Sequence, residues 1–220
     1  MVVGLGIGDQ AAGSALADAG VARAADIRVE ESIVDTRSAM RAGASTVLVG
    51  ERHAALVLTR SATVGYCALR GIAIGDGGRS RTTADGVLDQ ARTIRRALAD
   101  GRMKAAQVGY ARIVHTDPND DRAVSVLARA LGPFYERVVV QLVSVAGPAQ
   151  VAVANAVWGA VAVAVRWSAA ADRLERAPLE VSGVAREIEA ELGGRNVSVA
   201  LSVTLAADGT TTALAFGRSR

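Results

Sequence analysis

Apolar residues recur along this chain at two spacings, and segments of the two kinds follow one another. Alternating or continuous apolar positions predict strands, whereas apolar positions three or four residues apart predict helices. By this criterion strands are expected at 2–7, 27–34, 46–49, 54–59, 64–74, 108–115, 138–145, 197–205 and 210–216. Helices are expected at 9–25, with a break at Gly20 as the alternative, and at 83–99, 117–131, after Pro148, and at 182–192. Hairpin strands that precede alternating helices and strands predict an α/β fold with a mixed sheet.

The strands at 46–49, 54–59 and 64–74 are separated by the short polar segments 50–52 and 60–61, as in hairpins. Together with the helices and strands that follow, up to about residue 145, they resemble in shape one half of an actin or RNase H type domain. That superfamily places an aspartate after its first strand to hold a metal-bound nucleotide. Here Gly50 and Glu51 follow that strand. The resemblance therefore implies a copy without the catalytic acid.

The chain is long enough to bury one large core. We expect a main α/β domain over residues 1–172, and a C-terminal helix and β-hairpin over residues 173–220 that pack on the same core. Asp208 and Gly209 are typical turn residues between two alternating strands, so they predict the hairpin. Ser182 is expected to cap the preceding helix, because a serine hydroxyl accepts a hydrogen bond from the first helical turn.

Residues 138–165 carry no charge, and Arg137 and Arg166 flank them. An apolar helix of this length would span a bilayer. However, Gly147 and Pro148 divide the run, and its first half is rich in β-branched valine, which favours a strand. We expect a buried strand and a buried helix here, with membrane insertion as the less favoured alternative.

Composition narrows the choice of partners. The chain has 220 residues, of which 50% are apolar and only 3% aromatic, so a base-stacking surface is not expected. The 25 basic residues are offset by 22 acidic ones, and Arg92, Arg95 and Arg96 fall on the polar side of a predicted helix. These arginines are expected to form a solvated face rather than a nucleic-acid surface.

Cys67 is the one cysteine in the chain, which excludes an internal disulfide and a paired-cysteine metal or redox site. It lies in an apolar run, so a buried and inert thiol is expected. The N-terminus has no basic segment followed by an apolar one, as a secretory signal would. The cytoplasm is therefore the expected location.

A glycine pattern follows the first predicted strand. Residues 6–11 fit G-x-G-x-x-A, which lets a backbone approach a pyrophosphate at a helix N-terminus. Gly6 and Gly8 would hold the phosphates, and Glu30, near the end of the next strand, would bind a ribose hydroxyl. Asp9 argues against this site, because its charge would lie beside the phosphates. The glycines can also be explained as an irregular strand end.

A second glycine segment, Gly75-Asp76-Gly77-Gly78, precedes Arg79 and Arg81. Successive free N–H groups and nearby arginines can bind an anion, so Asp76, Gly77 and Gly78 are further candidate binding residues. The same residues are equally typical of a tight turn between a strand and a helix, which is the favoured interpretation.

Two histidines, His53 and His115, stand apart in the sequence. His115 ends a predicted strand, where catalytic residues of α/β proteins are found, and Asp117 or Asp120 could orient it as a general base. A loop residue with no catalytic role is the alternative. Neither a nucleophile elbow, nor a phosphate-binding P-loop, nor a zinc-protease motif occurs, so catalytic residues and cofactor stay undetermined.

Two functions remain open. The first is a non-catalytic binding or assembly protein with a degenerate actin-like body. It would associate with itself or with a protein partner through an apolar face of the helix at 151–165. The second is a nucleotide- or dinucleotide-binding enzyme that uses Gly6, Gly8 and Glu30. The missing catalytic acid and the hairpin strands favour the first.

Overall fold

The structure is a computed structural model, and it describes most of the chain. The described residues are 1–7, 10–20, 28–30, 35–36, 38–39, 42, 44, 46–51, 53–60, 65–76, 83–116, 122–145 and 151–218. They form a mixed α/β fold with two sheets, which confirms the predicted fold class.

The first sheet, sheet A, is built from the N-terminal third of the chain. Its order is β1 (Val2–Ile7), β4 (Ala54–Thr59), β3 (Thr46–Glu51) and β2 (Arg28–Glu30). β4 runs antiparallel to both β1 and β3, whereas β2 runs parallel to β3. α1 (Ala11–Asp18) packs on β1 and β4.

The second sheet, sheet B, contains strands from the rest of the chain. Its order is β5 (Ala68–Gly75), β9 (Thr211–Gly217), β8 (Val199–Leu205), β6 (Val108–His115) and β7 (Val139–Ser144). β9 is antiparallel to both of its neighbours, and β6 is parallel to β7 and β8. The strands β5, β8, β6 and β7 therefore all point the same way.

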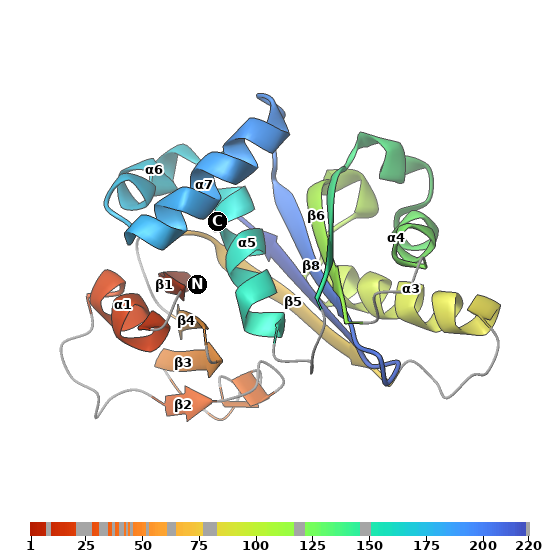
Figure 1. Cartoon of the computed structure of the whole chain (residues 1–220), viewed down its shortest axis with the longest axis horizontal. Helices are drawn as coiled ribbons and strands as arrows, with labels where there is room; N and C mark the ends of the chain where they lie inside the picture. The colour runs from red at the N-terminus through yellow and green to blue at the C-terminus, as the bar shows by residue number, and fades with distance from the viewer. Residues whose placement is uncertain are drawn as a thin grey trace.

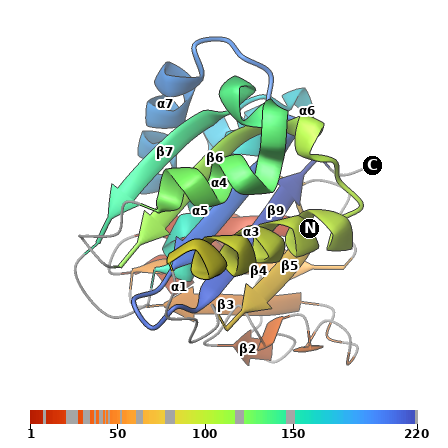
Figure 2. The ribbon, with the colours of Figure 1, turned by 90° about the vertical axis from the view of Figure 1, so that its right-hand side faces the viewer.

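Helices cover both faces of sheet B. On one face lie α3 (Thr83–Asp100) and α4 (Ala123–Leu131), as Figure 2 shows. On the other face α5 (Ala152–Ala164) lies between the two sheets, beside α7 (Leu179–Leu192) and α6 (Ser168–Glu175) (Figure 1). Two short 3-10 helices, η2 (Ala105–Gln107) and η3 (Gly132–Arg137), precede β6 and β7.

α5 is the central element of the core, and its sequence explains why. It is made almost entirely of Ala, Val and Gly, and both sheets pack on it in one apolar cluster. A Cβ at Gly159 would lie 2.2 Å from the Ser202 hydroxyl and 2.8 Å from the Phe216 ring, so only glycine lets the helix approach sheet B this closely. The uncharged run is thus a strand followed by a buried helix: the helix is buried as predicted, whereas the strand, β7, is half-buried to exposed and the prediction of a buried strand was wrong. Among the described helices, none is both long and apolar enough to cross a membrane.

This burial corrects one expectation. The helix at 151–165 was expected to offer an exposed apolar face for self-association, yet Val153, Val157 and Val161 are fully buried along it. Its apolar residues are buried or partly buried in the core of one chain, so the helix does not offer the expected exposed apolar face.

Of the predicted hairpins, those of β3 with β4 and of β8 with β9 are confirmed, whereas that of β4 with β5 is not. β3 and β4 form an antiparallel hairpin as predicted, but β5 leaves that sheet and pairs with β9 at the edge of sheet B. The expected meander of three hairpin strands is therefore absent, and with it the layout that resembled an actin or RNase H domain. The C-terminal hairpin is confirmed, since β8 pairs antiparallel with β9 and Asp208 Oδ1 accepts a 2.8 Å hydrogen bond from the Thr210 N–H in the turn.

Helix ends were predicted less well than strands. The predicted helix at 9–25 is α1, which already ends at Asp18. α7 begins at Leu179, so Ser182 lies inside its first turn, where its hydroxyl donates a 3.2 Å hydrogen bond to the Ala177 carbonyl. The prediction that Ser182 caps this helix was wrong. α4 begins at Ala123, and residues 117–121, where its start was expected, lie outside the described part of the chain.

Candidate functional site

The carboxyl ends of four parallel strands meet at one edge of sheet B. The strand pairings place Gly75, Thr211, Leu205, His115 and Ser144 in a single row across the five strands. In open α/β sheets ligands bind beyond the carboxyl ends of the strands, because the loops there converge and no helix blocks access. We call this row the carboxyl edge, and it is the candidate functional site.

His115 ends β6, next to the middle of this row, and its backbone is fixed on both sides. Its carbonyl accepts a 3.0 Å hydrogen bond from the Val145 N–H after β7. The next residue, Thr116, donates its N–H to the Leu205 carbonyl at 3.0 Å, and its hydroxyl accepts a 2.8 Å hydrogen bond from the Ala207 N–H. The imidazole is half-buried. A histidine held on a rigid strand end, and partly open to solvent, is suited to proton transfer.

The neighbouring positions supply further polar groups. Ser144 is exposed and lies directly beside His115 in the strand register. Thr211 shares the α3 face of β9 with Ala213. Among the described residues, its buried hydroxyl has no hydrogen-bond partner, and neither has the buried Gln90 Oε1 on α3. Buried polar groups are normally paired, so both atoms can bind a water molecule or a polar ligand group at this side of the sheet.

Cys67 does not belong to the carboxyl edge. It pairs with Val2 in an isolated bridge next to sheet A, and it is fully buried. Burial raises the pKa of its thiol, because a thiolate would lose its hydration there. The predicted burial of Cys67 is confirmed, and the chain offers no other thiol as a nucleophile.

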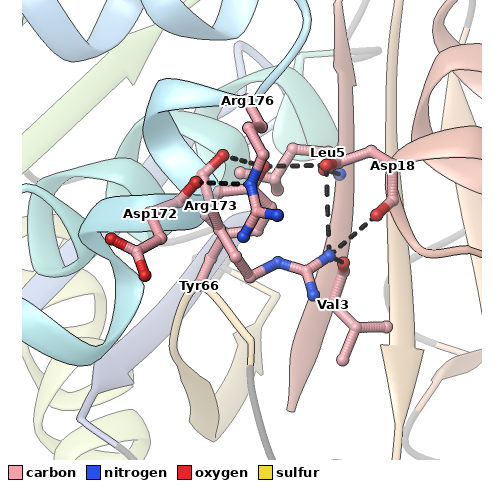
Figure 3. A network of polar contacts seen from close by, with 7 residues as sticks. All are labelled: Val3, Leu5, Asp18, Tyr66, Asp172, Arg173 and Arg176. Carbon is pink, nitrogen blue, oxygen red and sulfur yellow. Dashed lines mark hydrogen bonds and ion pairs between the residues drawn. The ribbon is translucent and has the colours of Figure 1, made fainter.

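A polar network outside the carboxyl edge joins sheet A to α6 (Figure 3). Asp18 accepts hydrogen bonds from the Tyr66 hydroxyl at 2.9 Å and from the Leu5 N–H at 3.0 Å. Arg173 donates to the backbone carbonyls of Val3 and Asp18, and its guanidinium lies 5.2 Å from the centre of the Tyr66 ring. Burial raises the pKa of Asp18 despite these donors. The Asp18 carboxylate, the Tyr66 hydroxyl and one Arg173 Nη are bound by neighbours within the chain, whereas the buried Arg173 Nε has no partner among the described residues; these bonds give the network a structural role.

A second network lies on the α5 and α7 face of sheet B. Gln141 Oε1 accepts hydrogen bonds from Arg112 Nε at 2.7 Å and from the Tyr110 hydroxyl at 3.0 Å, and its amide donates to Glu191 at 3.0 Å. The Arg112 guanidinium stacks 4.2 Å above the centre of the Trp158 ring. Desolvation lowers the pKa of Arg112. The polar groups of this network also bind one another, and they connect β6 and β7 with α5 and α7.

The structure separates the residues of the predicted glycine site. Gly6 lies in β1 and Glu30 in β2, at opposite edges of sheet A, with β3 and β4 between them. A Cβ at Gly6 would lie 1.9 Å from the Ala11 carbonyl, so the absence of a side chain lets α1 pack against β1. Gly8 lies outside the described residues. The geometry therefore does not bring Gly6 and Glu30 to one ligand.

The structure describes only part of the second predicted binding segment, Asp76-Gly77-Gly78. Asp76 directly follows β5 and is exposed, which places it at the carboxyl edge with His115. Gly77, Gly78, Arg79 and Arg81 lie outside the described residues, as do Asp117 and Asp120. His53 is exposed in the β3–β4 turn of the other sheet. Within the described ranges, no three His, Cys, Asp or Glu side chains gather as a metal site.

Sequence reasoning missed Ser144, Gln90 and Thr211. The only available signal was that each of the strands 68–75, 108–115 and 139–144 precedes a helix, which is typical of parallel strands whose carboxyl ends share an edge. The strand order that aligns them was not visible.

Comparison with known proteins identifies the fold. The sequence matches no protein-family model and no curated protein. Among solved structures, the chain is similar to an oxazolomycin ketosynthase domain of Streptomyces albus (TM-score 0.53, 14% identity, 85% of this chain and 61% of that one). It is also similar to 3-oxoacyl-[acyl-carrier-protein] synthase III of Aquifex aeolicus (TM-score 0.50, 15% identity, 95% and 82%) and to a beta-ketoacyl synthase of Burkholderia phymatum (TM-score 0.50, 20% identity, 79% and 44%).

These likenesses show the fold alone, because their sequence identity is low. The chain spans 61% of the length of the Streptomyces domain and 44% of that of the Burkholderia synthase. The expectation of a non-catalytic, actin-like binding or assembly protein is wrong, since the fold is that of ketosynthases. The alternative of a nucleotide- or dinucleotide-binding enzyme gains no support from these structures either.

Proposed function

We propose that this chain acts on acyl thioesters at the carboxyl edge of sheet B, and that His115 transfers protons there during acyl condensation. The observation that carries this proposal is the position of His115, on a fixed strand end within a fold shared with ketosynthases. One of the similar structures is named for a 3-oxoacyl product on an acyl-carrier protein. An acyl-carrier protein is therefore the proposed protein partner.

The chemistry requires a group of this kind. A 3-oxoacyl thioester forms when the α-carbon of one thioester bonds to the carbonyl carbon of another. The α-carbon must lose a proton or carbon dioxide, and the thiol that leaves the second thioester must gain a proton. A histidine can accept the first proton and donate the second, which contributes about 10²- to 10⁴-fold in rate.

Cys67 cannot hold an acyl group during this reaction. Its sulfur is fully buried, and its raised pKa keeps it protonated. The acyl group must therefore remain on the carrier thiol, or be held by a hydroxyl such as that of Ser144, or by a second protein. This separates the proposed reaction from one that proceeds through a cysteinyl thioester on this chain.

The test is to incubate the protein with acetyl and malonyl thioesters of pantetheine and of an acyl-carrier protein, and to detect 3-oxoacyl products by mass spectrometry. His115→Ala is compared with His53→Ala, a matched histidine in the exposed turn of sheet A. We expect His115→Ala to lower product formation by at least about 100-fold and His53→Ala to leave it unchanged. Equal activity of the two variants, or no turnover of any thioester, would contradict the proposal.

A further inference from the structure

A cavity of about 170 Å³ lies where sheet A meets the first half of β5, and we call it the β4–β5 pocket. Leu58 of β4 and Met1, directly before β1, line it from sheet A, and Leu69 and Ile72 line it from β5. These four residues give the pocket an apolar wall. An apolar cavity of about 150 Å³ holds benzene, so this one fits a ligand of about six to nine non-hydrogen atoms.

The pocket lies toward the amino end of β5, away from the carboxyl edge. Leu69 and Ile72 precede Gly75 by six and three residues, which correspond to about 20 Å and 10 Å along a strand. Asp100, which also lines the pocket, is the last residue of α3. The pocket is therefore separate from the candidate site at His115.

Two opposite charges line the pocket without binding each other. Arg70 is half-buried, and its guanidinium forms no hydrogen bond or ion pair with any residue in the described part of the chain. Asp100 is exposed, and its Oδ2 accepts a 3.1 Å hydrogen bond from the Ile72 N–H. This bond fixes the carboxylate beside β5. A half-buried arginine of this kind is suited to bind an anionic group that comes from outside the chain.

An irregularity in β5 determines the position of Arg70. The register with β9 shifts between Leu69 and Gly71, so Arg70 is the extra residue of a bulge. β-Bulges redirect a side chain and are frequent next to active sites. The stem of Arg70 packs beside Gly217, where an added Cβ would lie 3.2 Å from Arg70 Cδ. Because the guanidinium has no protein partner to lose, it can turn toward a ligand in the pocket without breaking a hydrogen bond.

We propose that the β4–β5 pocket binds a free α-amino acid with an aliphatic side chain, such as valine or leucine. Arg70 binds the carboxylate of the ligand, because the planar guanidinium matches a carboxylate in a bidentate pair. Asp100 accepts a hydrogen bond from the ammonium group, and the apolar wall covers the side chain. A simple carboxylic acid would bring a second negative charge near Asp100, and a simple amine would leave Arg70 without a partner. Only a zwitterion matches both charges.

This inference does not rest on the proposed function, because neither His115 nor the fold match enters it. The lining comes from both sheets, so a bound amino acid connects sheet A with sheet B. A ligand that binds only the folded chain also stabilises it. Occupation of the pocket should therefore raise the temperature of thermal unfolding.

The experiment measures binding of L-leucine to the full chain by isothermal titration calorimetry, together with its effect on thermal unfolding. Two matched probes each lack one charge of leucine: 4-methylpentanoate has no ammonium group, and 3-methylbutylamine has no carboxylate. We expect leucine to bind and to stabilise the chain. Each probe should bind at least about 10-fold more weakly, because a hydrogen bond between charged groups contributes about that much to affinity.

Two variants assign the binding to the pocket. Arg70→Gln and Asp100→Asn should each weaken leucine binding by about 10-fold or more. The amide oxygen in Asp100→Asn can still accept the Ile72 N–H, so this variant keeps the contact within the chain. Arg96→Gln is the control, since Arg96 is exposed on α3 and is not among the lining residues, and it should bind leucine as wild type does.

Three results would overturn the proposal. The first is a wild-type chain that neither binds about 10 mM leucine nor is stabilised by it. The second is a wild-type chain that binds 4-methylpentanoate or 3-methylbutylamine as tightly as leucine, which requires no variant to fold. The third is an Arg70→Gln variant whose affinity for leucine equals that of Arg96→Gln.

Discussion

The Tyr66 hydroxyl donates a 2.9 Å hydrogen bond to Oδ1 of Asp18, although the two residues are 48 positions apart in the chain. Tyr66 precedes β5 and Asp18 ends α1, so this bond ties the start of sheet B to the helix that covers sheet A. Oδ2 of the same carboxylate accepts the Leu5 N–H at 3.0 Å. Asp18 therefore accepts from two buried donors, of which the Tyr66 hydroxyl also lies 3.5 Å from the Arg173 carbonyl.

Replacement of Asp18 by alanine should destabilise the protein. The Leu5 N–H would lose its acceptor, and the Tyr66 hydroxyl would keep only its 3.5 Å hydrogen bond to the Arg173 carbonyl; a buried donor without an acceptor costs about 1–3 kcal/mol. We expect the free energy of unfolding in urea to fall by about 3 kcal/mol. Asp172→Ala is the control, because that carboxylate is exposed on α6 and its loss should cost no more than about 0.5 kcal/mol. Similar losses for both variants would show that the network does not stabilise the fold.

The raised pKa of Asp18 also gives a pH dependence with a definite sign. Burial is the largest cause of the shift, and it outweighs the hydrogen bonds from Tyr66 and Leu5. The folded state thus holds the proton to a higher pH than the unfolded chain, whose value is about 3.8. The stability that this group contributes is complete below that value, and it is lost as pH rises through the raised folded-state pKa.

The measurement compares wild type with Asp18→Asn, whose side chain has no charge at any pH. The free energy of unfolding of wild type minus that of the variant should decrease as pH rises from about 4 and then level off. A difference that increases with pH would mean that the Arg173 ion pair, at 3.9 Å, dominates over burial.

Local pattern was sufficient to predict most strands and several helices. The predicted bounds of β4 and β6 agree with the structure, and those of α3 differ by one residue. These segments have strong alternation or a clear apolar stripe, and turn residues bound them. Pairing partners are a different matter. β5 pairs with β9, which is far along the chain, and nothing in the local pattern of either strand encodes that contact.

The same limit applies to the site. The position of His115 at a strand end could be read from the sequence, because the alternation stops there. Its neighbours Ser144 and Leu205 come from two other strands, and only the strand order brings them together. Gly6 and Glu30 failed to meet for the same reason, since the sequence spacing of two strands does not tell whether they are adjacent.

Two helical glycines provide a matched pair for testing how closely α5 packs. A Cβ at Gly159 would lie 2.2 Å from the Ser202 hydroxyl and against the Phe216 ring, so Gly159→Ala should force α5 away from sheet B. We expect a loss of about 1–3 kcal/mol, as for other overpacked cores. At Gly183, on α7, no atom lies within 4 Å of an added Cβ, so Gly183→Ala should raise stability by about 0.5–1 kcal/mol. Thermal unfolding of the two variants measures both changes, and a Gly159→Ala variant as stable as wild type would contradict this packing.

Cys67 provides a test that separates a structural thiol from a catalytic one. Because the side chain is fully buried and its pKa is raised, the native protein should react with iodoacetamide only as fast as it unfolds. Urea should therefore accelerate labelling in step with the unfolding transition, as followed by intact mass. Cys67→Ala should remove labelling and leave any thioester-dependent activity within about twofold of wild type, since Cys67 lies beside sheet A, away from the carboxyl edge. Rapid labelling of the folded protein, or loss of that activity in Cys67→Ala, would instead identify Cys67 as an accessible nucleophile and would overturn the assignment of acyl chemistry to His115 without it.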